Sequence, residues 1–538
     1  MKITQLLKAA TAAGAIALLM GGSASAVTLN TMNGSEPGSI DPHKASGDWE
    51  NRIIGDYIEG LVAEDAHAEA IPGQAESWDV SADGLVYTFH LRSGIQWSDG
   101  TPVTAGDFEY AFRRLFNPAT ASEYAYLQYP IKGGSEIADG SMAVDSADFG
   151  VKSIDDKTLE ITLEGPTPYF IQALTHYTGY PVPRHVIEAK GDDWTKVENV
   201  VSNGPFKITE WVPGNYVKSV KSDTYYGAAD IKIDEVYYYV QDDLAAAFNR
   251  YRAGEYDILT DLPFDQQQLV RDTMPGEGRF APFSGLHYYV INQERKPFDD
   301  VNVRKALSIS INREIIGPDI WGSGEPPAYA WVPPGTANYE GVTPYMPAWA
   351  AEPYDQRVAE AKAIMEGLGY TADKPLQLQI RYNTNDNHQR LAVAISSMWE
   401  QINVKTELFN AETPVHYDAL RAGDFDVGRA GWLLDYSDPS NVLDLLKTGT
   451  MQDGKMNWGN NYGRFSNAEF DDLIGKAAAE PDLAVRAKEL GDAEKIAMDN
   501  FAAFPLAYYL AANVVKPNIK GFEDNAKDVH RTRWLTKE

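Results

Sequence analysis

The stretch "GRAGWLLDYSDPSN", from Gly428 to Asn441, places an acid where a buried strand should end. Its apolar run stops at Asp435, which precedes a tyrosine and the turn-forming residues Ser437–Pro439. A carboxylate at the end of a buried strand is costly unless a positive group or hydrogen-bond donors meet it. Three partners would satisfy Asp435: the cation of a ligand, a structural arginine, or the backbone of the turn, which the acid would then cap.

Motifs for catalysis and for metal binding are missing from the chain. There is no G-x-S-x-G nucleophile elbow, no H-E-x-x-H zinc helix and no cysteine, and the 9 histidines lack the spacing of a metal site. The segment Gly449–Lys455 has phosphate-loop spacing, but Met456 stands where the Mg²⁺-binding hydroxyl belongs, so we interpret it as a chance match. We predict a non-enzymatic protein without cofactor or metal. A secreted hydrolase that uses two of the many acids remains the alternative from another class.

The first residues have the pattern of a cleavable export signal. Lys2 and Lys8 precede the short apolar run Ala9–Met20, and Ala24 and Ala26 then give the A-x-A cleavage pattern. The apolar run is too short for a permanent membrane anchor. We therefore expect a signal peptide over residues 1–26, a periplasmic mature protein and no integral membrane segment in it.

Length and charge narrow the class further. A chain of 538 residues is too long for one hydrophobic core and predicts two or three domains. Its formal charge of -30 argues against a nucleic-acid partner, because phosphates would be repelled. The 30 tyrosines and 12 tryptophans fill cores or line a pocket for varied ligands.

Strand and helix patterns alternate along the chain, which predicts α/β architecture. A strand pattern covers 85–91, and a helix pattern follows from the N-cap residue Thr104 with Asp107 as its capping-box partner. The segments Arg252–Leu259 and Arg421–Gly428 share one plan of helix end, glycine, acid, aromatic residue and strand. If this echo is a duplication, the chain has two lobes of similar construction with a ligand cleft between them.

Five ordered segments carry a resemblance to a known family. They are "NGSEPGSIDPHKA", the Trp78–Arg114 block that contains "WSDGTPVTAGDF", "VSNGPFKI", "NQERKPFDDVNVRKALSISINRE" and "RAGWLLDYSDPSN". In this order they resemble the periplasmic oligopeptide-binding proteins of ABC transporters, within the larger peptide/nickel solute-binding group. The likeness covers nearly the whole mature chain.

The resemblance implies a two-lobed periplasmic-binding-protein fold of class II, α/β in content, with an extra domain inserted in the first lobe. After a signal peptide (1–26), the implied lobe I has three separate segments (27–58, 186–285 and 509–538). The extra domain (59–185) lies between the first and second of these segments, and lobe II (286–508) lies between the second and third. The chain would cross between lobes near 287–292 and 506–513.

The resemblance also implies a binding site. Asp435 matches the acid that binds the α-ammonium of an enclosed peptide, while Arg429 and His388 match positions that meet its C-terminal carboxylate. Trp432 matches an aromatic residue that lines the pocket. The tyrosines that we expect in the wall of the site are Tyr110, Tyr238 and Tyr288.

Two departures from the family pattern concern ligand choice. Thr413 stands where these proteins often place a tryptophan, and Trp321 stands where a lysine can reach the carboxylate of longer peptides. They leave peptide length and side-chain preference open. We predict a monomeric receptor that closes around short peptides and delivers them to an inner-membrane ABC permease, with murein peptides or dipeptides as the alternative ligands in the same class.

Overall fold

Two long strands at the centre of one sheet carry the chain between the two halves of the molecule. The computed structural model describes residues 26–452 and 454–538. Its main sheet has ten strands in the order β14-β13-β15-β12-β18-β11-β1-β10-β9-β8. These strands are β1 (Thr28–Gly34), β8 (Phe206–Val212), β9 (Tyr216–Lys221), β10 (Glu235–Val240), β11 (Ile258–Leu259), β12 (Gly278–Ile291), β13 (Leu376–Asn383), β14 (Val404–Ala411), β15 (Val427–Leu433) and β18 (Phe504–Val515).

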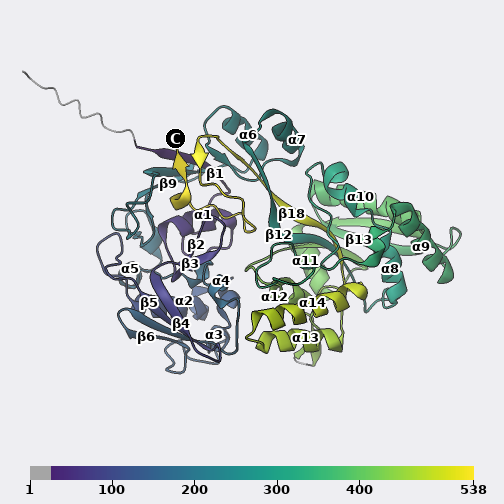
Figure 1. The fold of residues 1–538 in the computed structure, drawn as a ribbon, viewed down its shortest axis with the longest axis horizontal. Coiled ribbons are helices and arrows are strands. Elements are labelled where there is room, and N and C mark those ends of the chain that lie inside the picture. The colour runs from purple at the N-terminus through teal and green to yellow at the C-terminus, as the bar shows by residue number, and fades with distance from the viewer. Residues whose placement is uncertain (1–25, 453) are drawn as a thin grey trace, which may run out of the picture.

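The antiparallel pair β12–β18 lies between the two halves in Figure 1. We call the half that holds β1, β8–β11 and both ends of the described chain lobe I, and the half that holds β13–β15 lobe II. The register of β12 against β18 shifts between Pro282 and Leu286, and beyond this shift β12 also pairs with β15 of lobe II. The two predicted crossings lie on these two strands.

The helices cover the sheet in each lobe, and small sheets complete the fold. The helices are α1 (Asp48–Tyr57), α2 (Ala105–Phe116), α3 (Gly134–Ala138), α4 (Phe170–Ala173), α5 (Arg184–Lys190), α6 (Leu244–Arg252), α7 (Phe264–Thr273), α8 (Val301–Ile309), α9 (Tyr354–Gly367), α10 (Asp386–Glu400), α11 (Thr413–Ala422), α12 (Ser440–Leu443), α13 (Ala468–Ala479) and α14 (Leu483–Asp499). The two-stranded sheets are β2 (Val62–Glu64) with β3 (Ala70–Pro72), β16 (Thr450–Gln452) with β17 (Lys455–Asn457), and β19 (Ile519–Lys520) with β20 (Thr536–Lys537).

The two lobes repeat one strand arrangement on either side of the central pair. In lobe I, β11 is antiparallel to β18 and parallel to β1, and in lobe II, β15 is antiparallel to β12 and parallel to β13. The echo segments make these two strands: α6 is followed by Gly254 at φ 83° and then β11, and α11 is followed by Gly423 at φ 76° and then β15. The predicted order of helix, glycine and strand is confirmed in both segments, and the two-lobed α/β fold is confirmed with it.

A separate four-stranded sheet belongs to the expected extra domain. Its order is β4-β5-β7-β6, and its strands are β4 (Ala75–Val80), β5 (Val86–Leu91), β6 (Val151–Asp155) and β7 (Thr158–Thr162). Helix α2 begins at the predicted capping box, where Thr104 N donates to Asp107 Oδ2 at 2.8 Å. Phe108, Phe112 and Leu115 of this helix are buried in the core of the domain. The domain boundaries themselves stay a prediction.

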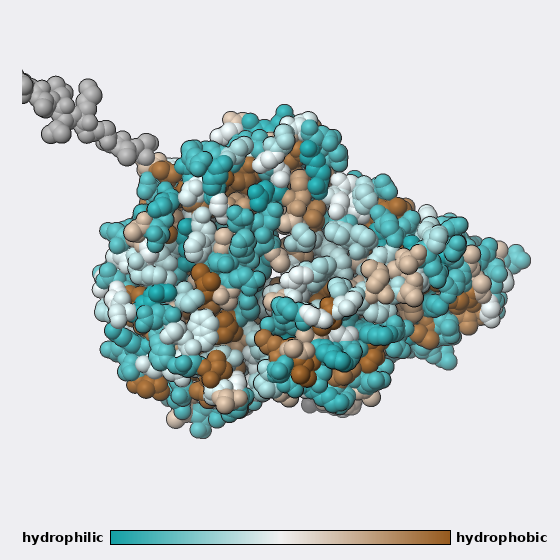
Figure 2. Space-filling view, viewed as in Figure 1, coloured by the Kyte–Doolittle hydropathy of each residue, from teal (hydrophilic) through white to brown (hydrophobic). Residues whose placement is uncertain are grey.

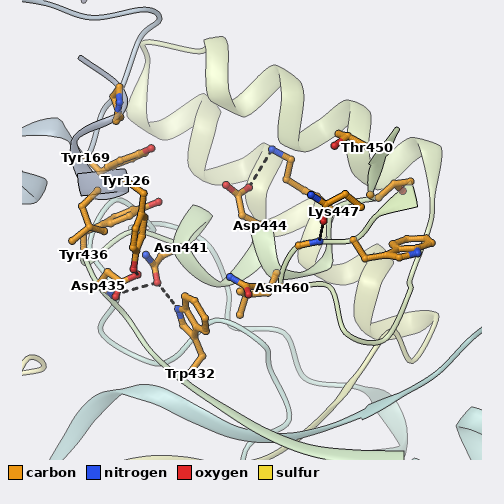
Figure 3. A pocket seen from close by; sticks show the side chains of 18 residues that line it. Tyr126, Tyr169, Trp432, Asp435, Tyr436, Asn441, Asp444, Lys447, Thr450 and Asn460 are labelled. Carbon is orange, nitrogen blue, oxygen red and sulfur yellow. Dashed lines mark hydrogen bonds and ion pairs between the residues drawn. The ribbon is translucent and has the colours of Figure 1, made fainter. Parts of the chain in front are cut away.

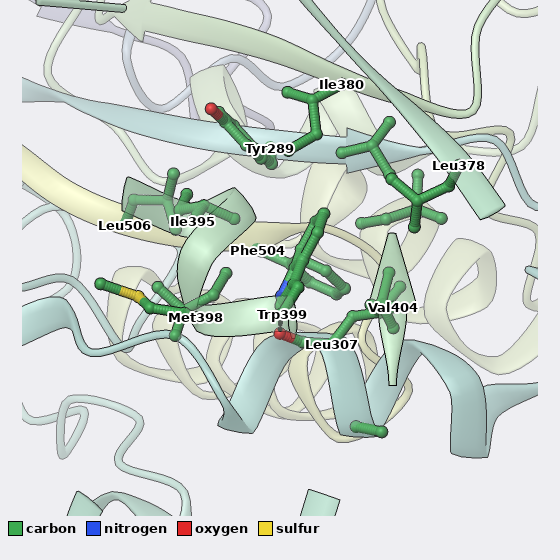
Figure 4. Packing of buried hydrophobic residues seen from close by; sticks show 14 of the residues in the cluster. Tyr289, Leu307, Leu378, Ile380, Ile395, Met398, Trp399, Val404, Phe504 and Leu506 are labelled. Atoms are coloured by element: carbon green, nitrogen blue, oxygen red, sulfur yellow. Dashed lines mark hydrogen bonds between the residues drawn. The ribbon is translucent and has the colours of Figure 1, made fainter. Parts of the chain in front are cut away.

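Lobe II has its own hydrophobic core, which fixes the strands that carry the site. Trp399 of α10 packs among Tyr289, Ile380 and Phe504, which come from three strands of the sheet (Figure 4). Its indole Nε1 donates to the carbonyl oxygen of Leu307 at 2.9 Å, so the polar atom is satisfied inside the core. The ends of β12 and β15 therefore rest on a rigid support.

Two further predictions concern membrane spans and the export signal. In the described part of the chain, no helix has the length and apolar character needed to cross a bilayer. The predicted export signal, except for Ala26, lies outside the described residues, as does the side chain of Thr413.

Candidate functional site

Three cavities follow one another between the lobes, where Figure 2 shows the surface hollowed. The Asp435 cavity, of about 390 Å³, has Tyr126 and Tyr169 of lobe I and Trp432 and Tyr436 of lobe II in its walls. The Arg429 cavity, of about 670 Å³, is also lined from both lobes. A third cavity of about 290 Å³ shares Asp435 with the first, and Leu433 and Phe283 with the second. The three form one continuous cleft.

Asp435 follows the end of β15 and has no cationic partner among the described residues. Its Oδ2 accepts one long hydrogen bond, 3.4 Å from Tyr126 Oη, and its backbone N is 3.4 Å from Asn441 Oδ1 (Figure 3). Burial raises the pKa of Asp435 to about 6, against the small opposing effect of these hydrogen bonds. A carboxylate in this state gains most from a ligand that supplies a positive charge.

Asp438 fills the two structural roles considered for Asp435, which are capping the turn and pairing with an arginine. Oδ1 of Asp438 accepts from Ser440 N at 2.9 Å and so caps the turn. Asp438 also makes a buried bidentate ion pair with Arg486, at 2.8 Å for each oxygen. The loop is therefore held by Asp438, and Asp435 is left for another partner.

Arg429 is a buried guanidinium without a carboxylate among the described residues. Its Nη2 donates to His287 Nδ1 at 3.0 Å and to Tyr509 Oη at 3.2 Å, and its Nη1 lies 3.5 Å from Asn383 Oδ1. Its Nε is buried without an acceptor. Burial and Arg429 itself hold the pKa of His287 well below its usual range, so His287 is a neutral acceptor. This cation is suited to bind an anionic group that enters the cavity.

His388 and Trp321 lie in the wall of the Arg429 cavity. Burial, followed by the charge of Arg429, lowers the pKa of His388 to about 3, so its ring is neutral. His388 Nδ1 lies 3.2 Å from the carbonyl oxygen of Asn383, which can only accept, so Nδ1 carries the proton and Nε2 is an acceptor. Trp321 donates to Asn387 O at 3.0 Å and is thereby fixed.

Trp432, Asn441 and the backbone of Asp435 are linked by hydrogen bonds. Trp432 Nε1 donates to Asn441 Oδ1 at 2.7 Å, and the same oxygen faces the backbone N of Asp435. In Figure 3 the indole ring borders the cavity next to the carboxylate. The position predicted for Trp432, in the wall of a pocket with Asp435, is the one in which the structure places it.

The structure corrects three predicted wall residues. Tyr238 and Tyr288 are each 2% exposed: Tyr238 donates to Asp56 inside lobe I, and Tyr288 packs against Trp331 in lobe II. Tyr110 lies on α2 with Arg184 over its ring at 5.5 Å, and it lines none of the three cavities. None of the three lines the cleft: Tyr238 and Tyr288 lie in the cores of lobes I and II, and Tyr110 is half-buried against the core of lobe I.

Sequence reasoning also missed residues of the cleft. Tyr126 of lobe I contacts Asp435, and Tyr169 of lobe I lines the same cavity, where its ring stacks on that of Tyr436 at 4.2 Å and 11° (Figure 3). Glu325 is a buried acid in the wall of the Arg429 cavity. The Ser-Asp-Pro turn pointed to Tyr436, but no local pattern distinguishes the other three from core residues.

The described residues contain no group of three or more His, Cys, Asp or Glu placed to hold a metal ion. The segment with phosphate-loop spacing forms the β16–β17 hairpin, with strand pairing from Thr450 to Asn457. No helix follows the second strand directly, as phosphate binding by that motif would require.

Comparison with known proteins identifies relatives over nearly the full length. The family model of the bacterial extracellular solute-binding proteins, family 5 Middle, matches residues 69–454. The periplasmic oligopeptide-binding protein OppA of Escherichia coli K12 is 38% identical over 528 residues, which is 95% of each chain.

Two solved structures are also similar. The unliganded open form of the periplasmic murein tripeptide-binding protein MppA has a TM-score of 0.84 at 34% identity, covering 96% of this chain and 98% of the other. The Haemophilus influenzae OppA complex with the peptide RPPGFSPFR has a TM-score of 0.76 at 33% identity, covering 95% and 99%. Of these two structures, the unliganded open form gives the higher TM-score.

Proposed function

Because the chain belongs to the family 5 bacterial extracellular solute-binding proteins, we propose that it is a periplasmic receptor that encloses short peptides between its lobes and delivers them to an ABC transporter permease. The observation that carries this function is a pair of opposite, unpaired charges in one cleft: the carboxylate of Asp435 and the guanidinium of Arg429. A free peptide has the complementary pair, an ammonium at one end and a carboxylate at the other.

Asp435 is assigned to the peptide's α-ammonium. At 4 Å and an effective dielectric constant near 20, such a pair gains about 4 kcal/mol. Tyr126 Oη already lies against Asp435 Oδ2, so it would border the bound amine from lobe I. Trp432 and Tyr436 would form the walls around the first residue of the peptide.

Arg429 is assigned to the C-terminal carboxylate, which would accept from the unpaired Nε and from Nη atoms. His388 has a different role from the one that the resemblance implied, because its neutral Nε2 is an acceptor. It would accept an N–H of the peptide backbone near this end. Backbone contacts of this kind carry no side-chain information, so they suit a receptor for many sequences.

Binding without catalysis is the activity that this site supports. The relatives reported above are named as binding proteins, and no motif of a known catalytic site is present in the sequence. Murein peptides are the alternative ligands, because a periplasmic murein tripeptide-binding protein, MppA, is among the similar structures. We further propose a monomer and a cleavable signal peptide over residues 1–26.

Native mass spectrometry of the purified protein tests this function. Adducts with the masses of peptides of two to five residues are expected, and they should disappear in Asp435→Asn while persisting in a control variant, Asp424→Asn. Asp424 is an exposed acid of lobe II that pairs with Arg295, outside the cleft. Shortening of added peptides would instead identify a hydrolase, and adducts without a free amine would contradict the assignment of Asp435.

A further inference from the structure

Glu325 is a carboxylate in the cleft that the peptide's two ends do not use. It follows the turn Ile316–Trp321 and precedes Pro327, which bridges to Ala507 on β18. A Cβ on Gly317 would lie 2.2 Å from the carbonyl oxygen of Glu325, so only glycine allows the turn to pack this closely. Glu325 is thus held in one place beside the central strands.

This carboxylate has no cation within ion-pair distance among the described residues. Glu325 is only 4% exposed, yet it borders the Arg429 cavity. The hydroxyl of Ser323 donates a hydrogen bond to it, and so does a backbone N–H of its own segment. Arg271 is the nearest arginine that affects it, but the Arg271 guanidinium lies over the Phe280 ring at 3.6 Å and donates to Ser323 O at 3.3 Å instead.

Tyr509, Glu325 and Arg429 all line the same cavity. Its hydroxyl accepts from Arg429 Nη2 at 3.2 Å, and both Arg429 and Glu325 act electrostatically on its phenol. The wall of this cavity therefore contains a cation and an anion, neither of which has an ion-pair partner among the described residues. A ligand group that satisfies both has a carboxylate and an ammonium close together.

We propose that Glu325 is a specificity residue that selects peptides whose C-terminal residue has a side-chain ammonium group, as lysine has. The inference rests on the proposed function, because it requires the terminal carboxylate at Arg429. The methylene stem of a lysine would pack on the apolar part of the wall, which includes Phe283, Leu433 and Leu510.

The charge state of Glu325 makes this preference dependent on pH. Burial raises the pKa of Glu325 to about 7, more than Arg271 lowers it. Below pH 7 the protonated acid no longer attracts an ammonium, so the preference should fade as the pH falls. The other charged or titratable groups that border the cavity are Arg52, Arg429, His287, His388, Asp48, Asp242, Asp261 and Asp528.

Two peptides of equal length isolate this interaction: Ala-Ala-Lys and Ala-Ala-norleucine, which differ only in the side-chain ammonium. Calorimetry at pH 8 should give at least tenfold tighter binding of the lysine peptide to the wild-type protein. The ratio of the two affinities should approach one at pH 5, while effects on Asp435 cancel in the ratio. In Glu325→Gln the ratio should be near one at both pH values, and in the exposed control Glu340→Gln it should match wild type.

The possible failures can be told apart. A ratio below threefold in the wild-type protein at pH 8, with both peptides bound, overturns the role of Glu325 and leaves the proposed function standing. A tenfold ratio that persists in Glu325→Gln also overturns it and points to the acids of lobe I. If neither peptide binds, the proposed function fails, and this inference fails with it. The wild-type pH series tests the role of Glu325 even if the variant does not fold.

Discussion

Replacing Asp435 by asparagine tests the assignment on which the function depends. The change keeps the shape of the side chain and its contact with Tyr126, and removes only the charge. The free acid is held in an unfavourable state, because burial shifts its pKa from 3.8 to about 6. Two pKa units correspond to about 3 kcal/mol of lost solvation, which a ligand's ammonium would recover.

The expected loss of affinity follows from the same numbers. The attraction between an ammonium and the carboxylate is about 4 kcal/mol at most, a factor of roughly a thousand. Part of it remains in the variant, because an amide oxygen still accepts hydrogen bonds from the amine. We therefore expect Asp435→Asn to bind trialanine between about tenfold and a thousandfold more weakly than wild type.

Calorimetry with trialanine and its N-acetyl derivative separates the charge pair from other effects of the substitution. Wild type should strongly prefer the free amine, whereas Asp435→Asn should bind the two peptides about equally. The Asp424→Asn control should keep the wild-type preference. This cycle measures the coupling between one charge on the ligand and one on the protein.

The pH dependence of Asp435 has a defined sign. Peptide binding favours the ionised acid, so the affinity should be constant above pH 6 and fall by up to tenfold per unit below it. The raised pKa also means that the free protein loses stability as the pH rises through 6. Free Asp435→Asn should therefore unfold at the same or a higher temperature than wild type at pH 7.

Two results would refute the reasoning about Asp435. One is an affinity of Asp435→Asn for trialanine within threefold of wild type. The other is a marked fall in the melting temperature of the free variant, because it would show that the charge serves the fold instead of a ligand.

Three further substitutions probe the rest of the cleft. Arg429→Gln should weaken trialanine binding at least tenfold in calorimetry, while C-terminally amidated trialanine should bind wild type and variant alike. Tyr169→Leu removes the stack on Tyr436, worth about 0.5–1.5 kcal/mol, and should weaken all peptides by one common factor and enlarge the free molecule in small-angle scattering. Arg486→Met leaves the buried carboxylate of Asp438 without a counter-charge. It should lower the free energy of unfolding, measured with a chemical denaturant, by about 3–5 kcal/mol.

Each of these three predictions has an outcome that would contradict it. If Arg429→Gln still binds trialanine more tightly than amidated trialanine, a residue other than Arg429 binds the carboxylate. Tyr237→Leu removes a tyrosine stack within lobe I and should change neither size nor affinity, so equal effects in it and in Tyr169→Leu would exclude an interlobe role. Wild-type stability in Arg486→Met would mean that Asp438 is neutral or hydrated.

Local patterns predicted the parts of the fold that local physics decides. The capping box at Thr104 and the two glycines after α6 and α11 depend on residues within one helical turn, and each lies where the pattern indicated. Asp435 was identifiable for the same reason, since an acid after an apolar strand is anomalous in any fold. The repeated plan of Arg252–Leu259 and Arg421–Gly428 suggested two lobes of similar construction, and the family resemblance implied them.

The parts that were mispredicted or missed depend on tertiary packing. Tyr238 lies in a run of three tyrosines on β10, where the sequence does not tell which side chain meets the core, and Tyr288 lies in the part of β12 that is buried on both faces. Glu325 is an ordinary acid in sequence and becomes exceptional only because β18 and the turn at Gly317 enclose it. Tyr126 reaches Asp435 from 309 residues away in the chain.

The unpaired charges of the cleft should oppose its closure in the absence of a ligand. In the free molecule the lobes already touch through the Tyr169–Tyr436 stack and the long Tyr126–Asp435 contact, but neither neutralises a charge. Closing the empty cleft would remove water from Asp435 and Arg429 without supplying a counter-charge, which opposes closure. A bound peptide supplies a counter-charge to Asp435 and to Arg429, so that with a peptide present the electrostatic free energy favours closure. It therefore stabilises the closed state by its differential affinity for it, whatever its side chains are.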